Sequence, residues 1–153
     1  MKKNIILAII IKLFLSYQLE AVEVGQWTFV VEDDYCYIGS APIKEEGDYT
    51  NRDATYVLVY RINKSSEKIV QITAGYNYTE NKPVIVKIDQ STFEFFGQED
   101  SAWTKNKDKD VIFAMQKGMT MTIQGYSSRG TLTSDTYTLK GFTTAFNRLS
   151  KDC

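Results

Sequence analysis

Apolar and polar residues alternate along most of this chain, in short runs that end at turn-forming residues. Strict alternation places successive side chains on opposite faces of a strand, so each run predicts a strand with one buried face. The segments between the runs are rich in the acidic, Ser, Asn and Gly residues that form turns. Eight runs meet these criteria: residues 26–32, 35–41, 55–62, 68–75, 83–89, 92–97, 119–127 and 133–141.

The connections between neighbouring runs favour antiparallel hairpins, because most of them are short. Asp33 and Asp34 separate the first two runs, and Gln90 and Ser91 lie between the fifth and the sixth. Pro83 opens a run, at a position where its missing N–H costs no ladder hydrogen bond. We therefore expect consecutive strands to pair as hairpins.

Two segments depart from alternation and predict helices. In residues 106–117, Asn106 is the expected N-cap and Val111, Ala114 and Met115 share one face. In residues 142–151, apolar side chains recur at helical spacing. The chain is thus predicted to be mainly β: an antiparallel β-sandwich or flattened barrel of about eight strands, with the two short helices as lids or edge covers.

The first 21 residues are expected to be a secretory signal peptide, followed by a single β-rich domain over residues 22–153. Lys2 and Lys3 precede an apolar run at residues 5–11 that resumes at residues 13–15, and the small Ala21 suits a cleavage site. The apolar part is shorter than a membrane-spanning helix requires. A retained helix lying at the membrane interface is the alternative.

Export to an oxidising compartment would allow the two cysteines to form a disulfide. In an oxidising compartment Cys36, in an early predicted strand, and Cys153, the last residue, can form a disulfide, and we predict that they do. Such a bridge would fix a chain end that otherwise frays. Two free thiols, or a Cys153 that cross-links subunits, are the alternatives; the wide spacing speaks against a zinc site.

Composition argues against most catalytic chemistry. The chain has no histidine, which removes the commonest general base and the usual catalytic triad. The adjacent acids Asp33–Asp34 and Glu45–Glu46 lie in predicted turns or loops, and residues 106–110 lack the pattern of a calcium loop. We predict no catalytic residue, no metal site and no cofactor. With a formal net charge of −1, nucleic acid is not an expected partner.

Tyrosines raise the question of binding. The chain has 10 tyrosines and 2 tryptophans, and at alternating positions most of them are expected in the core or in cross-strand pairs. Tyr76 and Tyr78 lie between two predicted strands, and we expect them to be exposed on a loop. There they would bind a partner or a sugar; inert surface aromatics are the alternative.

The sequence resembles the invasion-associated locus B family of alphaproteobacterial exported proteins. The resemblance runs from Trp27 to Cys153 and is carried by "CYIGSAPIKEEGDY", "AGYNY", the long segment from "SAWTKNKDKDVIFAMQKG" to "LKGFTTAF", and the final cysteine. Its most specific residues, in the family's order, are Met115, Gly118, Met119, Arg129, Gly130, Asp135, Tyr137, Leu139, Gly141, Phe142 and Ala145.

The resemblance implies an exported, mostly β protein, periplasmic or associated with the outer membrane, linked in some pathogens to invasion of host cells. It implies no catalytic residues. Two functions from different classes follow. The first is a non-catalytic binding or structural module that meets an envelope or host-surface component, free in the periplasm or associated peripherally with a membrane. The alternative is a glycan-acting enzyme that uses carboxylates from separate strands.

Overall fold

The computed structural model describes residues 22–62 and 64–153. The predicted leader, residues 1–21, lies outside the described residues. In the part that is described, no helix is long and apolar enough to cross a membrane. The helices are α1 (Asp108–Lys117) and α2 (Phe142–Lys151). The strands are β1 (Thr28–Val31), β2 (Tyr35–Ser40), β3 (Lys44–Gly47), β4 (Tyr56–Ile62), β5 (Ile69–Thr73), β6 (Pro83–Ile88), β7 (Ser91–Gln98), β8 (Ser101–Trp103), β9 (Thr120–Tyr126) and β10 (Leu132–Thr138).

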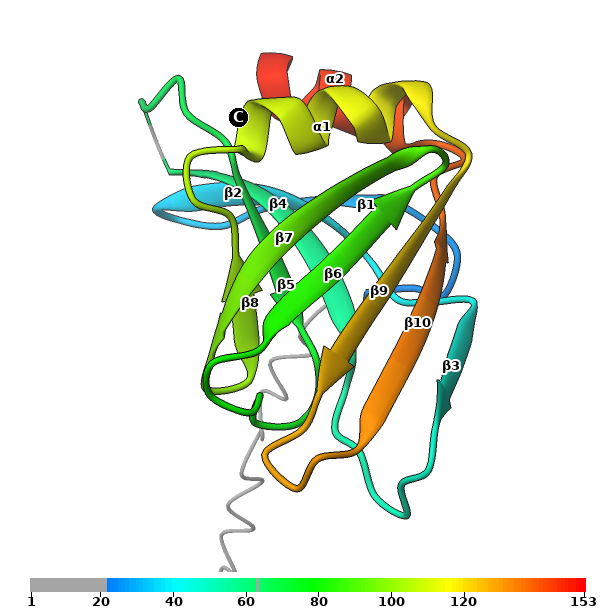
Figure 1. Ribbon diagram of the computed structural model, residues 1–153. Coiled ribbons are helices and arrows are strands. Elements are labelled where there is room, and N and C mark those ends of the chain that lie inside the picture. The colour runs from blue at the N-terminus through cyan, green and yellow to red at the C-terminus, as the bar shows by residue number, and fades with distance from the viewer. Residues whose placement is uncertain (1–21, 63) are drawn as a thin grey trace, which may run out of the picture.

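The described strands form one antiparallel sheet in the order β1-β2-β4-β5-β8-β7-β6-β9-β10-β3. The sheet curls into a half-barrel, and both helices lie across one of its ends (Figure 1). The hairpins β1–β2, β4–β5, β6–β7 and β9–β10 are all present. The prediction of a mainly β, antiparallel fold is therefore confirmed, and the flattened barrel is closer to the structure than the sandwich.

The predicted strand number was wrong, because ten strands are present among the described residues rather than about eight. The two additional strands are β3 and β8. The four residues of β3 are all exposed, so this strand has no apolar alternation, and it forms by pairing with β10. The three residues of β8 are too few to show a period. Strand β3 therefore depends on a partner that is distant in sequence, whereas β8 pairs with the preceding strand β7 through a tight turn and with β5 on its other side.

Contacts between the two ends of the sheet keep it curled. Strands β2 and β3 are consecutive in the chain but lie near opposite ends of the sheet. The chain between them contacts β10, where the Ile43 N–H donates to the Thr136 carbonyl at 2.8 Å. Near the other end, the Trp27 indole N–H donates to the Thr138 carbonyl at 2.9 Å. These bonds join segments that an open, flat sheet would hold far apart.

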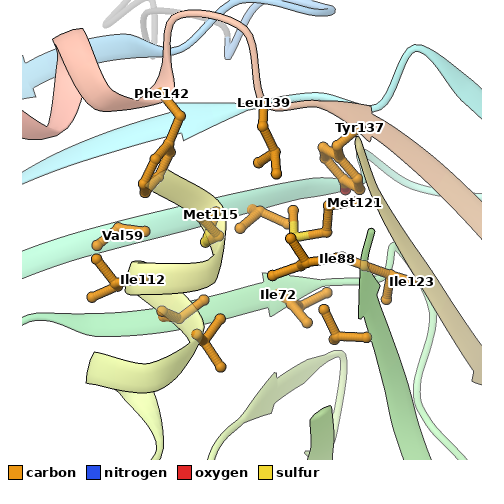
Figure 2. Close-up of a cluster of buried hydrophobic side chains, with 14 of the residues drawn as sticks. Val59, Ile72, Ile88, Ile112, Met115, Met121, Ile123, Tyr137, Leu139 and Phe142 are labelled. Carbon is orange, nitrogen blue, oxygen red and sulfur yellow. The ribbon is translucent and has the colours of Figure 1, made fainter. Parts of the chain in front are cut away.

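The core lies between the concave face of the sheet and the two helices. Figure 2 shows Ile112 and Met115 of α1 and Phe142 of α2 beside inward side chains of the sheet, among them Ile72 and Ile88. The predicted faces are largely correct, since α2 buries Phe142, Ala145 and Leu149. In α1 the buried residues are Val111, Ile112 and Met115. Ile112 is therefore buried, whereas Ala114, which was expected on the buried face, is only partly buried. Apolar burial of this kind is the main stabilising term of the fold.

Helix α1 begins at Asp108 and not at the predicted residue 106. Asn106 has a φ of 60°, outside the helical region, and makes no cap. The Asp108 carboxylate instead accepts from the Val70 N–H at 2.8 Å and from the Thr104 hydroxyl at 2.8 Å. A contact with strand β5 therefore sets the start of the helix.

Cys36 on β2 and Cys153 after α2 form a disulfide, the pairing that the sequence predicted. Their Cα atoms are 5.8 Å apart, and 117 positions separate them in the sequence. Cys36 is buried, so the bond ties the end of the chain to the core. Helix α2, which covers β1 and β2, is thus fixed at its C-terminal side.

Replacing Cys153 by Ser should lower the free energy of unfolding by about 4 to 5 kcal/mol, because the unfolded chain regains the entropy of a very long loop. Chemical denaturation without reductant measures the change. Reduced wild-type protein is the matched control and should unfold together with the variant. Equal stability of Cys153→Ser and oxidised wild type would show that the bridge does not stabilise the fold.

Candidate functional site

The end of the half-barrel opposite the helices contains a buried ion pair. The two terminal nitrogens of Arg52 donate to the two carboxylate oxygens of Asp135 at 2.7 and 2.6 Å, and Arg52 Nε donates to the Ala74 carbonyl at 2.7 Å. The side chains of Arg52 and Asp135 are 2% and 4% exposed. Bidentate, charge-assisted geometry of this kind is among the strongest hydrogen bonding in proteins.

Sequence and topology explain how the pair meets. Asp135 occupies an inward position of β10, between the buried Thr133 and Tyr137. Arg52 comes from the loop over residues 48–55 that follows β3. This loop is held by a hydrogen bond from the Asp53 N–H to the Gly75 carbonyl at 3.0 Å. Gly75 has a φ of 70°, and a Cβ there would collide with the Asp53 carbonyl, so only glycine permits this close approach.

Two tyrosines enclose the guanidinium of Arg52. Its central carbon lies 5.3 Å from the centroid of the Tyr49 ring and 5.1 Å from that of Tyr76. Cation–π contacts of this kind are strengthened when the cation is removed from water. The Tyr49 hydroxyl donates to Glu45 at 3.3 Å, and the Tyr76 hydroxyl bonds to the Thr133 hydroxyl at 2.7 Å. Tyr76 is thus held by a short hydrogen bond, and Tyr49 by a longer one at the exposed side of the ion pair.

Burial perturbs the titration of both charged partners. Desolvation raises the pKa of Asp135, and the Arg52 guanidinium opposes this shift by stabilising the carboxylate. Desolvation lowers the pKa of Arg52, but the hydrogen bonds and charge of Asp135 outweigh it, so that the pKa of Arg52 is raised overall. The Arg52 charge therefore favours the ionised form of Asp135, and Asp135 offsets the cost of burying the Arg52 charge.

Tyr78 is buried, so the prediction that it is exposed on a loop was wrong. Its side chain is 7% exposed and its ring makes an edge contact with Tyr76, with centroids 5.4 Å apart. Gly97 and Gly125 make room for this ring, because a Cβ on either glycine would come within 2.7 Å of it. Tyr76 is partly buried and does face a cavity. Two tyrosines separated by one residue thus have different roles, Tyr78 in the core and Tyr76 in the site.

A cavity of about 420 Å³ lies outside the ion pair, at the open end of the half-barrel. We call it the mouth cavity. Its volume falls within the range of about 300 to 1,000 Å³ that is typical of small-molecule sites. Its walls come from the loop after β3, the segment after β5 and the β9–β10 turn. The lining residues are Asp48, Tyr49, Thr50, Asn51, Arg52, Tyr76, Asn77, Ser127, Ser128, Arg129, Thr131 and Thr133.

The acids considered from sequence do not converge on a reactive centre. Asp33 and Asp34 lie in the exposed turn between β1 and β2. The Glu46 carboxylate forms an ion pair with the Lys44 ammonium, 2.8 Å away, on the outer face of β3. A Glu45 carboxylate oxygen lies 3.6 Å from a terminal nitrogen of Arg52. Among the described residues, no group of His, Cys, Asp or Glu could hold a metal ion.

Of the two residues on which the site depends, Asp135 was named from sequence only as one of the residues that carry the family resemblance, and Arg52 was not singled out. One signal for Asp135 was present, because the alternation Thr133, Asp135, Tyr137 places a carboxylate on the inward face of its strand. A charge at such a position must find a partner. Nothing local identified Arg52 as that partner, since 83 positions separate the two residues.

The fold and the site define a class of protein: a β half-barrel closed by helices at one end and organised around a buried ion pair at the other. Residues 29–150 match the family described as invasion associated locus B (IalB) protein. The chain belongs to this family, which confirms the resemblance expected from the sequence. A search of curated proteins found no match.

A solved structure supports the fold. The chain is similar to the crystal structure of invasion associated protein B from Bartonella henselae, with a TM-score of 0.57 and 17% sequence identity. The match covers 82% of this chain and 92% of the Bartonella chain. At this level of identity the similarity establishes a common fold, and function has to be argued from the site.

Substituting Asp135 by Asn should lower the free energy of unfolding by about 3 to 5 kcal/mol, because it leaves the buried Arg52 charge with only the partly exposed Glu45 carboxylate, 3.6 Å away, as a counter-charge. Denaturant titration at neutral pH measures the loss. Glu46→Gln is the matched control; it removes an acid of an exposed pair on the adjacent strand and should cost less than about 1 kcal/mol. Equal effects of the two substitutions would contradict the role given to the buried pair.

Alkaline titration should show phenols that ionise only when the protein unfolds. Burial raises the pKa of Tyr76, Tyr78 and Tyr137 above the ordinary value. The stability that this difference contributes is complete below about pH 10, the unfolded value. It is lost as pH rises toward the folded values. Tyrosinate absorbance and circular dichroism, followed together, should show a final rise that coincides with unfolding. Ionisation of all the tyrosines in a still-folded chain would contradict this assignment.

Proposed function

We propose that this protein is an exported, non-catalytic binding module of the cell envelope that contacts an envelope or host-surface component through the mouth cavity. The leader-like N-terminal sequence supports export, as does the Cys36–Cys153 disulfide, since such bonds persist in oxidising compartments. Membership of a family described as invasion associated supports a role at the contact with host cells.

The mouth cavity is the observation that carries the proposal. Its base is held by the hydrogen bonds of Arg52 and by the packing of Tyr49 and Tyr76, so its shape exists before any ligand arrives. A preformed site binds without the entropy cost of ordering loops and side chains. The segments that line the cavity lie at the end of the half-barrel away from α1 and α2 (Figure 1), so a ligand there would contact neither helix.

The chemistry of the cavity favours binding over the alternative of carboxylate catalysis. Glycan cleavage by carboxylates needs two of them facing one ligand, with different proton affinities. Both oxygens of Asp135 are engaged by Arg52, and Asp48 is the one acid among the described residues that line the cavity. Among the described residues, two carboxylates that could act as general acid and general base therefore do not face the cavity together.

A substitution that fills the mouth cavity tests whether the protein binds its partner there. Ser128 is exposed at the cavity wall in the β9–β10 turn, and Ser128→Trp should fill part of the cavity without entering the core. Gln90→Trp, in the exposed turn between β6 and β7 at the helix-covered end, is the matched control. Labelled protein would be applied to cultured animal cells and to isolated bacterial outer membranes. The membrane arm also tests peripheral membrane association.

We expect Ser128→Trp to weaken surface binding by about tenfold or more, equivalent to roughly 1.4 kcal/mol, while Gln90→Trp binds like wild type. Circular dichroism of both variants controls for folding. Absence of binding by the wild-type protein, or equal binding by the two variants, would refute the mouth cavity as the contact site.

A further inference from the structure

The charged groups at the base of the mouth cavity are already neutralised within the protein. Every nitrogen of the Arg52 guanidinium donates a hydrogen bond, two of them to Asp135 and one to the Ala74 carbonyl. At the wall of the cavity Asp48 and Arg129, one acid and one base, are both exposed. A charged ligand would lose its hydration and would meet no buried, uncommitted charge of opposite sign.

The polar groups that remain available in the cavity are neutral. Five lining residues have amide or hydroxyl side chains that make no hydrogen bond to other described residues: Thr50, Asn51, Asn77, Ser128 and Thr131. An amide carries both donors and an acceptor, and a hydroxyl can donate and accept. Groups of this kind match ligand hydroxyls, which also donate and accept.

Aromatic surface lies beside these neutral groups. Tyr49 and Tyr76 both line the cavity, and Tyr49 remains 37% exposed although its ring contacts Arg52. A sugar ring combines the two properties that this arrangement suits, because its C–H groups pack against aromatic rings while its hydroxyls bond to amide and hydroxyl side chains. A purely apolar ligand would leave the amides and hydroxyls unpaired.

We infer that the mouth cavity binds a neutral saccharide, with Asn77 and its neighbouring hydroxyl groups holding the sugar hydroxyls and Tyr49 or Tyr76 contacting the ring. The inference rests on the proposed function and specifies its ligand. The saccharide is a unit of a larger surface glycan, since the cavity wall includes the exposed residues Asp48, Ser128 and Arg129, past which a glycan chain can continue into solvent.

The experiment uses the purified, oxidised protein and matched pairs of disaccharides at millimolar concentration. Each neutral disaccharide, such as cellobiose, maltose or lactose, is compared with a counterpart in which one hydroxymethyl group is a carboxylate. Saturation-transfer NMR detects binding, and calorimetric titration measures the affinity. Asn77→Ala removes an amide of the cavity and keeps the backbone carbonyl that accepts from the Ser128 N–H. Gln90→Ala, at the helix-covered end, is the matched control.

Binding of at least one neutral disaccharide, weakened about tenfold by Asn77→Ala and unchanged by Gln90→Ala, is the expected result. Binding only of the carboxylate forms would overturn the inference, as would neutral binding that Asn77→Ala leaves unchanged. Failure of all the saccharides, while Ser128→Trp still abolishes surface binding, would overturn the ligand class and leave the proposed function standing. Surface binding that Ser128→Trp leaves unchanged would instead refute the proposed function.

Discussion

The contact between Arg52 and Asp135 is the constraint on which the open end of the half-barrel depends. Removing two opposite charges from water costs several kcal/mol for each ion unless they are paired in good geometry. Here the pair joins β10 to the loop after β3, and the Arg52 bond to Ala74 adds the segment after β5. Three segments distant in the sequence are therefore held together at one point, and the mouth cavity forms above it.

Different interactions hold the two ends of the half-barrel together. At one end α1 and α2 bury apolar side chains, and the disulfide fixes the chain terminus against β2. At the open end the segments are held by polar contacts: the Arg52–Asp135 ion pair, the tyrosine rings beside Arg52 and the hydrogen bond between the Tyr76 and Thr133 hydroxyls. An apolar lid would give stability but no surface for a polar ligand. This division explains why the candidate site lies where it does.

Local patterns predicted the parts of the fold that local patterns determine. Alternation identified the four hairpins, and helical spacing identified the face of α2 that contains Phe142, Ala145 and Leu149. The disulfide followed from the two cysteines together with the expectation of export. Strand β3 could not be predicted, because its exposed residues carry no pattern and its pairing partner β10 lies far along the chain. The burial of Tyr78 depends on the space above Gly97 and Gly125 on two other strands, and the ion pair depends on a contact across 83 positions.

A buried Arg52, each of whose three guanidinium nitrogens donates a hydrogen bond, organises the mouth, and NMR of the arginine side chains in the wild-type protein tests this directly. One guanidinium, assigned to Arg52 and sensitive to Asp135, is expected to exchange its protons with water far more slowly than the other arginines and to rotate slowly about its terminal bonds. Arg52 protons that exchange as rapidly as those of the exposed Arg129 would contradict the account.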